Sequence, residues 1–227
     1  MNRLEGHQAA VADDTKPGLD FAKGTEMTSA ELREIVYSSE FKQGMVELSS
    51  YLASIMQERP IIYLLAKCLW KRGYKFELED KRRDLFVNDK HLEFKFTHDN
   101  TIVNELRSWP NLDKLWAAVQ ARQISETWVM AQLYKDVCVK KPHIFVWIIC
   151  SRDLSKVVAD DLKRISEWIK QREYNKMHPY NSNDEFLTVS DLFLEKLQAV
   201  RPFSVLKEAI VTNGDFPSTY HFRICEF

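Results

Sequence analysis

The sequence lacks the features that define several large protein classes. It contains no apolar run of about 18 residues, so we expect no membrane-spanning segment. The N-terminus has no apolar core of the kind found in secretory signal peptides. The four cysteines are far apart and form no Cys-x-x-Cys pair, which favours buried thiols over disulfides or a zinc site and suits a reducing cytoplasm. These cysteines are Cys68, Cys138, Cys150 and Cys225.

Familiar catalytic and cofactor motifs are also missing. There is no Gly-x-x-x-x-Gly-Lys phosphate loop, no Gly-x-Gly-x-x-Gly cofactor turn and no Gly-x-Ser-x-Gly nucleophile elbow. The six histidines show no zinc-ligand spacing. We find no internal repeat, heptad pattern or low-complexity tract. These absences exclude the commonest nucleotide-dependent and serine-hydrolase classes.

Charge of one sign is not in excess. The chain has 32 Lys and Arg against 33 Asp and Glu, so nucleic-acid binding would need a local patch. Residues 67–83 contain seven basic side chains and three acidic ones, and form either such a patch or a solvated helix end and loop. The candidates for nucleic-acid contact are Lys71, Arg72, Lys81, Arg82 and Arg83.

Residues 84–87 and 90–97 are predicted to form a β-hairpin. The two residues between them, Asn88 and Asp89, tolerate the positive φ angles of a tight hairpin turn. Counting outward from this turn places Asp84 opposite Glu93. Opposed residues lie about 5 Å apart on one face of a sheet, so the two carboxylates are expected to be neighbours.

The predicted register separates a polar face of the hairpin from an apolar one. Lys95 shares the face of Asp84 and Glu93, and His91 lies there either as a substrate contact or as an exposed side chain. Opposed carboxylates repel unless they are neutralised, by Mg²⁺ or Mn²⁺ or by Lys95 and Arg82. The core face comprises Leu85, Leu92, Phe94 and Phe96.

The segment before the hairpin has the pattern of a helix and a strand. Pro60 suits the first turn of a helix, Gly73 ends it, and residues 74–78 resemble a strand. Glu58 therefore lies at the helix entry, where it either stabilises the helix dipole or serves a functional site. Glu47 is a possible substitute in that second role.

These residues together resemble the core of the PD-(D/E)xK, or restriction-endonuclease-like, nucleases. In that family a helix bearing a Glu precedes a three-stranded meander, whose second strand opens with Asp and whose third carries Glu-x-Lys. Here the matching set is Glu58, Gly73, Asp84 and Glu93-Phe-Lys95. The resemblance covers residues 58–97 and, more weakly, the chain to Cys150. Arg83 stands where the family often has proline, which is not a ligand.

The resemblance implies a chemistry for each matched residue. Asp84, Glu93 and the backbone carbonyl of Phe94 would hold one or two Mg²⁺ (or Mn²⁺) ions, with Glu58 as a further acidic group. Lys95 would act on the attacking water or on the developing charge. The implied function is a metal-dependent endonuclease on nucleic acid, with double-stranded DNA expected, RNA permitted, and a homodimer suited to cutting both strands. The alternative is a catalytically silent nucleic-acid-binding or assembly subunit.

The remaining segments complete an α/β prediction. Residues 1–27 are expected to form a mobile arm, and Thr28 with Glu31 forms a capping box that opens a helix. The predicted fold is a single domain over residues 28–227, with a restriction-endonuclease-like core at about 58–150 and a mixed central sheet flanked by helices, with extra helices at both ends. Helices are expected at 39–56, at 111–134 with a break near Ser125, and at 157–174, 191–200 and 203–211, with a loop at 175–184 and strands at 143–150 and 220–227.

Overall fold

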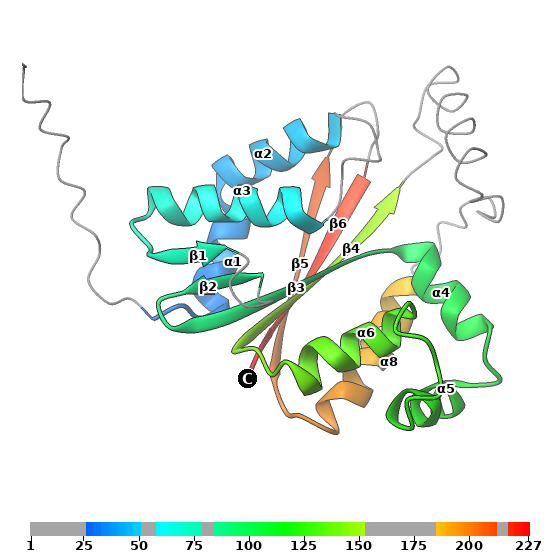
Figure 1. The fold of residues 1–227 in the computed structure, drawn as a ribbon. Helices are drawn as coiled ribbons and strands as arrows, with labels where there is room; N and C mark the ends of the chain where they lie inside the picture. Colours follow the sequence, from blue (N-terminus) through cyan, green and yellow to red (C-terminus); the bar gives the residue numbers. More distant parts are fainter. Residues whose placement is uncertain (1–25, 51–57, 79–83, 153–184, 213–217) are drawn as a thin grey trace, which may run out of the picture.

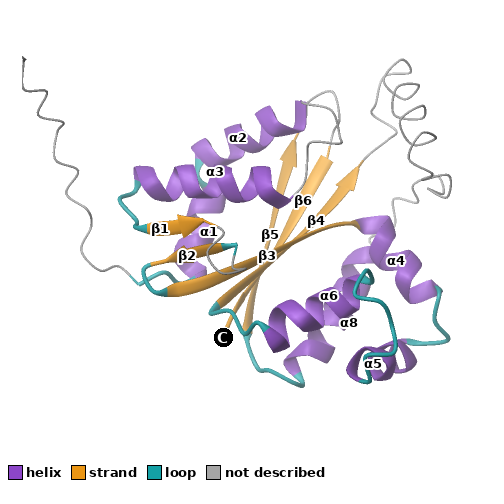
Figure 2. Cartoon of the chain, in the orientation of Figure 1, coloured by secondary structure: helices purple, strands orange, loops and turns teal. Residues whose placement is uncertain are grey.

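A mixed β-sheet forms the middle layer of the molecule, and helices cover both of its faces (Figures 1 and 2). The computed structural model describes residues 26–50, 58–78, 84–152, 185–212 and 218–227. Within these residues the sheet has six strands in the order β1-β2-β3-β4-β6-β5. β3 and β4 are parallel, and the other neighbours are antiparallel. The strands are β1 (Phe76–Leu78), β2 (Leu85–Val87), β3 (Lys90–His98), β4 (Ile144–Arg152), β5 (Ser204–Thr212) and β6 (Ser218–Glu226).

The hairpin between β2 and β3 has the predicted register. Leu85 pairs with Leu92, and the turn residues Asn88 and Asp89 have φ angles of 43° and 65°. Two consecutive positive φ angles are the geometry that matches the twist of the flanking strands. β1 pairs with the other side of β2, which completes the expected antiparallel meander.

Three helices from the N-terminal part of the chain cover one face of the sheet (Figure 1). They are α1 (Ser29–Tyr37), α2 (Ser39–Ser50) and α3 (Glu58–Lys71). The predicted capping box of Thr28 and Glu31 opens α1, and Gly73, with φ 80°, follows the end of α3. Met27 is buried in the core beneath these helices, so the last residue of the expected N-terminal arm is packed.

The opposite face carries the helices that connect β3 to β4, together with α8. Side chains of β4 alternate between the two cores, with Val146 in the first and Phe145 and Trp147 in the second. Burial on both faces explains the continuous apolar run that predicted a central strand. The helical elements here are α4 (Asp99–Arg107), α5 (Leu112–Gln120), α6 (Val129–Tyr134), the π-helix η2 (Lys135–Val139) and α8 (Glu185–Gln198).

The prediction of a helix at residues 203–211 is wrong. This segment is the edge strand β5, which pairs along its whole length with β6, so the extra helices expected at the C-terminal end reduce to α8 followed by two strands. Pairing with a neighbour and β-branched residues such as Val205 and Ile210 outweighed the local helical pattern. α8 also begins earlier than the helix predicted at 191–200, and α4 was not predicted.

Some predictions fall outside the described residues. These are the arm over residues 1–25, the end of the helix at 39–56, the helix at 157–174 and the loop at 175–184. Cys68, Cys150 and Cys225 are buried free thiols, as expected, and Cys138 is partly buried. Among the helices that the structure describes, none is long and apolar enough to cross a membrane.

Candidate active site

The candidate site forms beside the part of β3 that continues past Leu85, the first residue of β2. Pairing of β2 with β3 stops at Leu85, which lies opposite Leu92. Among the described residues, the following N–H groups on that edge of β3 therefore have no strand partner. Two acidic side chains accept these hydrogen bonds instead. The Phe94 N–H donates to Asp84 Oδ2 at 2.7 Å, and the Phe96 N–H donates to Glu58 Oε2 at 3.0 Å. Alternate residues of a strand point their N–H groups to one edge, so both carboxylates lie along that edge.

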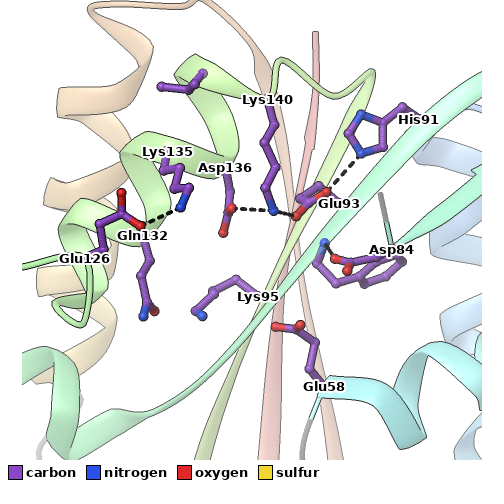
Figure 3. Close-up of a pocket in the computed structure, with 12 residues that line it drawn as sticks. Glu58, Asp84, His91, Glu93, Lys95, Glu126, Gln132, Lys135, Asp136 and Lys140 are labelled. Atoms are coloured by element: carbon purple, nitrogen blue, oxygen red, sulfur yellow. Dashed lines mark hydrogen bonds and ion pairs between the residues drawn. The ribbon is translucent and has the colours of Figure 1, made fainter. Parts of the chain in front are cut away.

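A cavity of about 690 Å³ opens beside this edge, and all of the residues predicted for the metal and catalytic sites line it. The sheet therefore joins one side chain from the start of α3 with residues of the β2–β3 hairpin. In Figure 3, Lys95 projects from β3 into the cavity, and Glu58 approaches it from α3. The predicted residues in the lining are Glu58, Asp84, Glu93, Phe94 and Lys95.

The opposite wall of the cavity comes from α6 and η2, and sequence reasoning missed it. Lys140, directly after η2, forms a hydrogen-bonded ion pair with Glu93 Oε1. The same ammonium lies 2.9 Å from Asp136 Oδ1 (Figure 3). The spacing of four between Asp136 and Lys140 marks a helical ion pair in the sequence, but nothing local connects either residue with Glu93. The other lining residues from this wall are Glu126, Gln132, Lys135 and Val139.

His91 contacts the second oxygen of Glu93. Its Nε2 lies 2.9 Å from Glu93 Oε2, and the histidine is only 5% exposed. The expectation of a lone exposed histidine is therefore wrong, because the side chain faces into the cavity wall rather than outward. Glu93 is itself 1% exposed, and both of its oxygens have side-chain partners. Burial of this carboxylate is compensated by one lysine and one histidine.

Three acidic groups of the cavity, Asp84, Glu58 and Asp136, are held in an environment that disfavours their charge. Burial, followed by repulsion from Glu93, raises the pKa of Asp84 to about 7. Burial also raises the pKa of Glu58 and of Asp136. Burial alone would lower the pKa of Lys140, but its hydrogen bonds to Glu93 and Asp136 outweigh this effect and raise it. The cavity lining contains more carboxylates than lysines, so its own cations do not neutralise all of its acidic groups.

The donor atoms of the site suit a hard divalent cation, but they are engaged by protein groups. The carboxylates of Asp84 and Glu93 and the carbonyl of Phe94 are the oxygen ligands that Mg²⁺ and Mn²⁺ take. Within the described residues, however, no three acidic, histidine or cysteine side chains converge as a metal-binding group. Lys140 and His91 hold Glu93, and backbone N–H groups hold Asp84 and Glu58. A metal ion at Glu93 Oε1 would replace Lys140.

Of the predicted nucleic-acid contacts, the two that the structure describes, Lys71 and Arg72, are not in the cavity. Lys71 and Arg72 lie at the end of α3 opposite Glu58, and Lys71 pairs with Glu40 of α2 at 2.6 Å. Lys81, Arg82 and Arg83 fall outside the described residues. Glu47, the possible substitute for Glu58, lines a separate groove between α2 and α3. The structure thus brings the hairpin residues and Glu58 together, but not Lys71 and Arg72.

Comparisons of the chain with protein-family models, with curated proteins and with solved structures gave no match.

Proposed function

We propose that this chain is a metal-dependent nuclease with a restriction-endonuclease-like core. The observation that carries the proposal is the convergence of Glu58, Asp84, Glu93 and Lys95 on one cavity. These residues come from a helix entry, the position directly before one strand and the middle of the next strand, in the order that the family pattern requires. The antiparallel β1-β2-β3 meander, followed by a helical connection to a parallel β4, supports the same core.

Asp84, Glu93 and the Phe94 carbonyl would hold Mg²⁺ or Mn²⁺, with Glu58 as a further acidic group nearby. When bound, the ion supplies charge that offsets the phosphate oxygens and makes a water molecule more acidic. Lys95 brings a positive charge into the cavity and would stabilise the negative charge that develops on the phosphate. Asp136 would position Lys140 once that ammonium leaves Glu93. The proposed substrate is DNA.

The ion pair between Lys140 and Glu93 supports a second candidate function. An ammonium that already neutralises Glu93 removes part of the demand for a metal ion. Under this alternative the chain is a catalytically silent nucleic-acid-binding or assembly subunit, and Lys140 occupies the cation position permanently. Calorimetry separates the two proposals: Mn²⁺ binding that depends on Asp84 and Glu93 supports the enzyme, and its absence supports the silent subunit.

Cleavage of nucleic acid is the direct test. Wild type and Asp84→Ala would be incubated with supercoiled plasmid, linear duplex, single-stranded DNA and RNA, in Mg²⁺, Mn²⁺ or EDTA. We expect metal-dependent cutting by wild type and none by Asp84→Ala, with folding checked by circular dichroism. Lys114→Ala, on the exposed surface of α5, is the matched control and should cut normally. Full activity of Asp84→Ala would refute the site.

A further inference from the structure

The outer surface of α3 carries a row of alternating basic and aromatic side chains, which we call the α3 stripe. It consists of Arg59, Tyr63, Lys67 and Trp70, all exposed on a helix whose other face is buried in the core. At about 100° per residue, these four positions lie within an arc of roughly 80°. The sequence therefore places them on a single ridge of the helix.

The two aromatic residues of the α3 stripe lie largely outside the core. Trp70 is 55% exposed and Tyr63 is 50% exposed, whereas Leu65, Leu69 and the other core positions of α3 are buried. Single exposed apolar residues are common on protein surfaces. Two large aromatic rings alternating with cations along one ridge form a pattern that stacks bases and holds phosphates.

Acidic side chains border the α3 stripe on the α2 side. Glu40 and Glu47 line the same groove as Tyr63 and Lys67, so phosphates would be repelled from the α2 wall of that groove. Glu40 also pairs with Lys71, and the cations within the stripe are Arg59 and Lys67. Charge complementarity thus favours a narrow polyanion over a broad duplex.

The α3 stripe leads to the candidate active site. Arg59 follows Glu58, whose carboxylate lies in the cavity at the start of the same helix. Successive members are four or three residues apart, or roughly 5 to 6 Å along the axis. The two cations, Arg59 and Lys67, are eight residues apart, or about 12 Å along the axis, so they would hold alternate phosphates of an extended single strand. A strand on the ridge would therefore be directed toward the cavity.

We infer that the α3 stripe binds single-stranded nucleic acid, with bases stacked on Tyr63 and Trp70 and phosphates held by Arg59 and Lys67. Bases paired in a duplex do not expose their faces to such rings, so the ligand must be unpaired. The inference rests on the proposed nuclease function only in assigning the bound strand as substrate. Binding itself requires neither metal nor cleavage.

Fluorescence anisotropy in EDTA tests binding apart from catalysis. The probes are labelled oligothymidylate and oligouridylate of about 15 nucleotides and a duplex of the same length. We expect wild type to prefer the single strands, with the two single-stranded probes reporting whether the sugar matters. Trp70→Ala should weaken binding roughly 5- to 150-fold, while Trp70→Phe, which retains a stacking ring, should bind nearly as wild type.

A salt titration and matched controls complete the test. Lys67→Ala should reduce the slope of log affinity against log salt by about 0.7, and Lys114→Ala on α5 should leave the affinity unchanged. Tyr63→Ala provides a second test of stacking, with folding of each variant confirmed by thermal melting. Unchanged binding by folded Trp70→Ala and Tyr63→Ala, or tighter binding of the duplex, would overturn the inference.

Failure of the α3 stripe and failure of the nuclease proposal are distinguishable. Asp84-dependent cutting without single-strand binding in EDTA would overturn the inferred binding at the α3 stripe and leave the nuclease proposal intact. Stripe-dependent binding without cutting of any substrate would support the stripe and favour the silent subunit.

Discussion

The Lys140 ammonium binds Glu93 Oε1, so a cation from the end of η2 holds the carboxylate that the hairpin presents to the cavity. Glu93 lies on β3, and Lys140 comes from the far side of the connection between β3 and β4. The two residues thereby connect the β3 wall of the cavity, which the sequence predicted, with the η2 wall, which it did not predict. Any divalent cation at Glu93 must compete with this ammonium.

Replacing Lys140 should strengthen metal binding. In Lys140→Met the competing ammonium is absent and Glu93 Oε1 is open, so we expect Mn²⁺ affinity to rise by roughly tenfold in isothermal titration calorimetry. Lys135→Met is the control, because Lys135 pairs with the exposed Glu126 rather than with Glu93. Weaker Mn²⁺ binding by Lys140→Met than by Lys135→Met would contradict competition between the Lys140 ammonium and the metal ion for Glu93.

Replacing Lys95 should separate chemistry from metal binding. Lys95 lines the cavity without belonging to the proposed metal ligands, so Lys95→Met should retain Mn²⁺ affinity while the cleavage rate falls on the order of 10²–10³-fold. Lys95→Arg preserves the charge and should recover part of the rate. Quantitative cleavage and calorimetry on the same preparations provide the measurement. Equal cleavage by Lys95→Met and wild type would remove Lys95 from the mechanism.

The raised pKa of Asp84 predicts how stability depends on pH in the metal-free protein. Its pKa moves from 3.8 to about 7 on folding, so the folded state binds the proton more tightly. The resulting stability is present below the unfolded pKa and is lost as pH rises through about 7. Asp84→Asn carries no charge and can still accept the Phe94 N–H.

In urea unfolding with EDTA at about pH 8, the free energy of unfolding of Asp84→Asn should therefore exceed that of wild type by on the order of 3 kcal/mol. This difference should shrink toward about pH 4. Asp113→Asn, at an exposed carboxylate on α5, should show no such dependence. A difference between Asp84→Asn and wild type that is independent of pH would show that the carboxyl does not titrate in this range.

Glu105 supports the missed wall of the cavity from a distance. Its carboxylate, on α4, accepts hydrogen bonds from the N–H groups of Val129 and Met130, at 2.5 and 2.7 Å, at the start of α6. Glu105→Ala leaves these buried donors unpaired and should destabilise the fold by about 1–3 kcal/mol, measured by chemical unfolding. Glu105→Gln keeps an acceptor and should be milder. Equal stability of the two variants would exclude a capping role.

The predicted half of the site depends on short-range geometry. Asn88 and Asp89 set a two-residue turn, and the alternation of a strand then fixes which side chains share a face. Asp84 and Glu93 could be placed in one site from the sequence because they lie only a few residues from that turn. Gly73 and Pro60 likewise marked the ends of α3 through backbone properties of single residues.

The helix wrongly predicted at residues 203–211 shows the limit of local patterns. Apolar spacing in this segment suited a helix, but β6 offered backbone partners along the whole of β5. Strand propensity depends on neighbours that may lie anywhere in the chain, so the local sequence does not decide between the two structures.

By itself, the sequence determined the hairpin, its register and the shared face of Asp84, Glu93 and Lys95. Only the tertiary structure decided that Lys140 meets Glu93, 47 residues away, and that His91 is buried beside the same carboxylate. The reason is physical. A turn and an alternating strand are specified by bonds between adjacent residues, whereas contact between β3 and η2 depends on how the whole connection packs against the parallel strand β4.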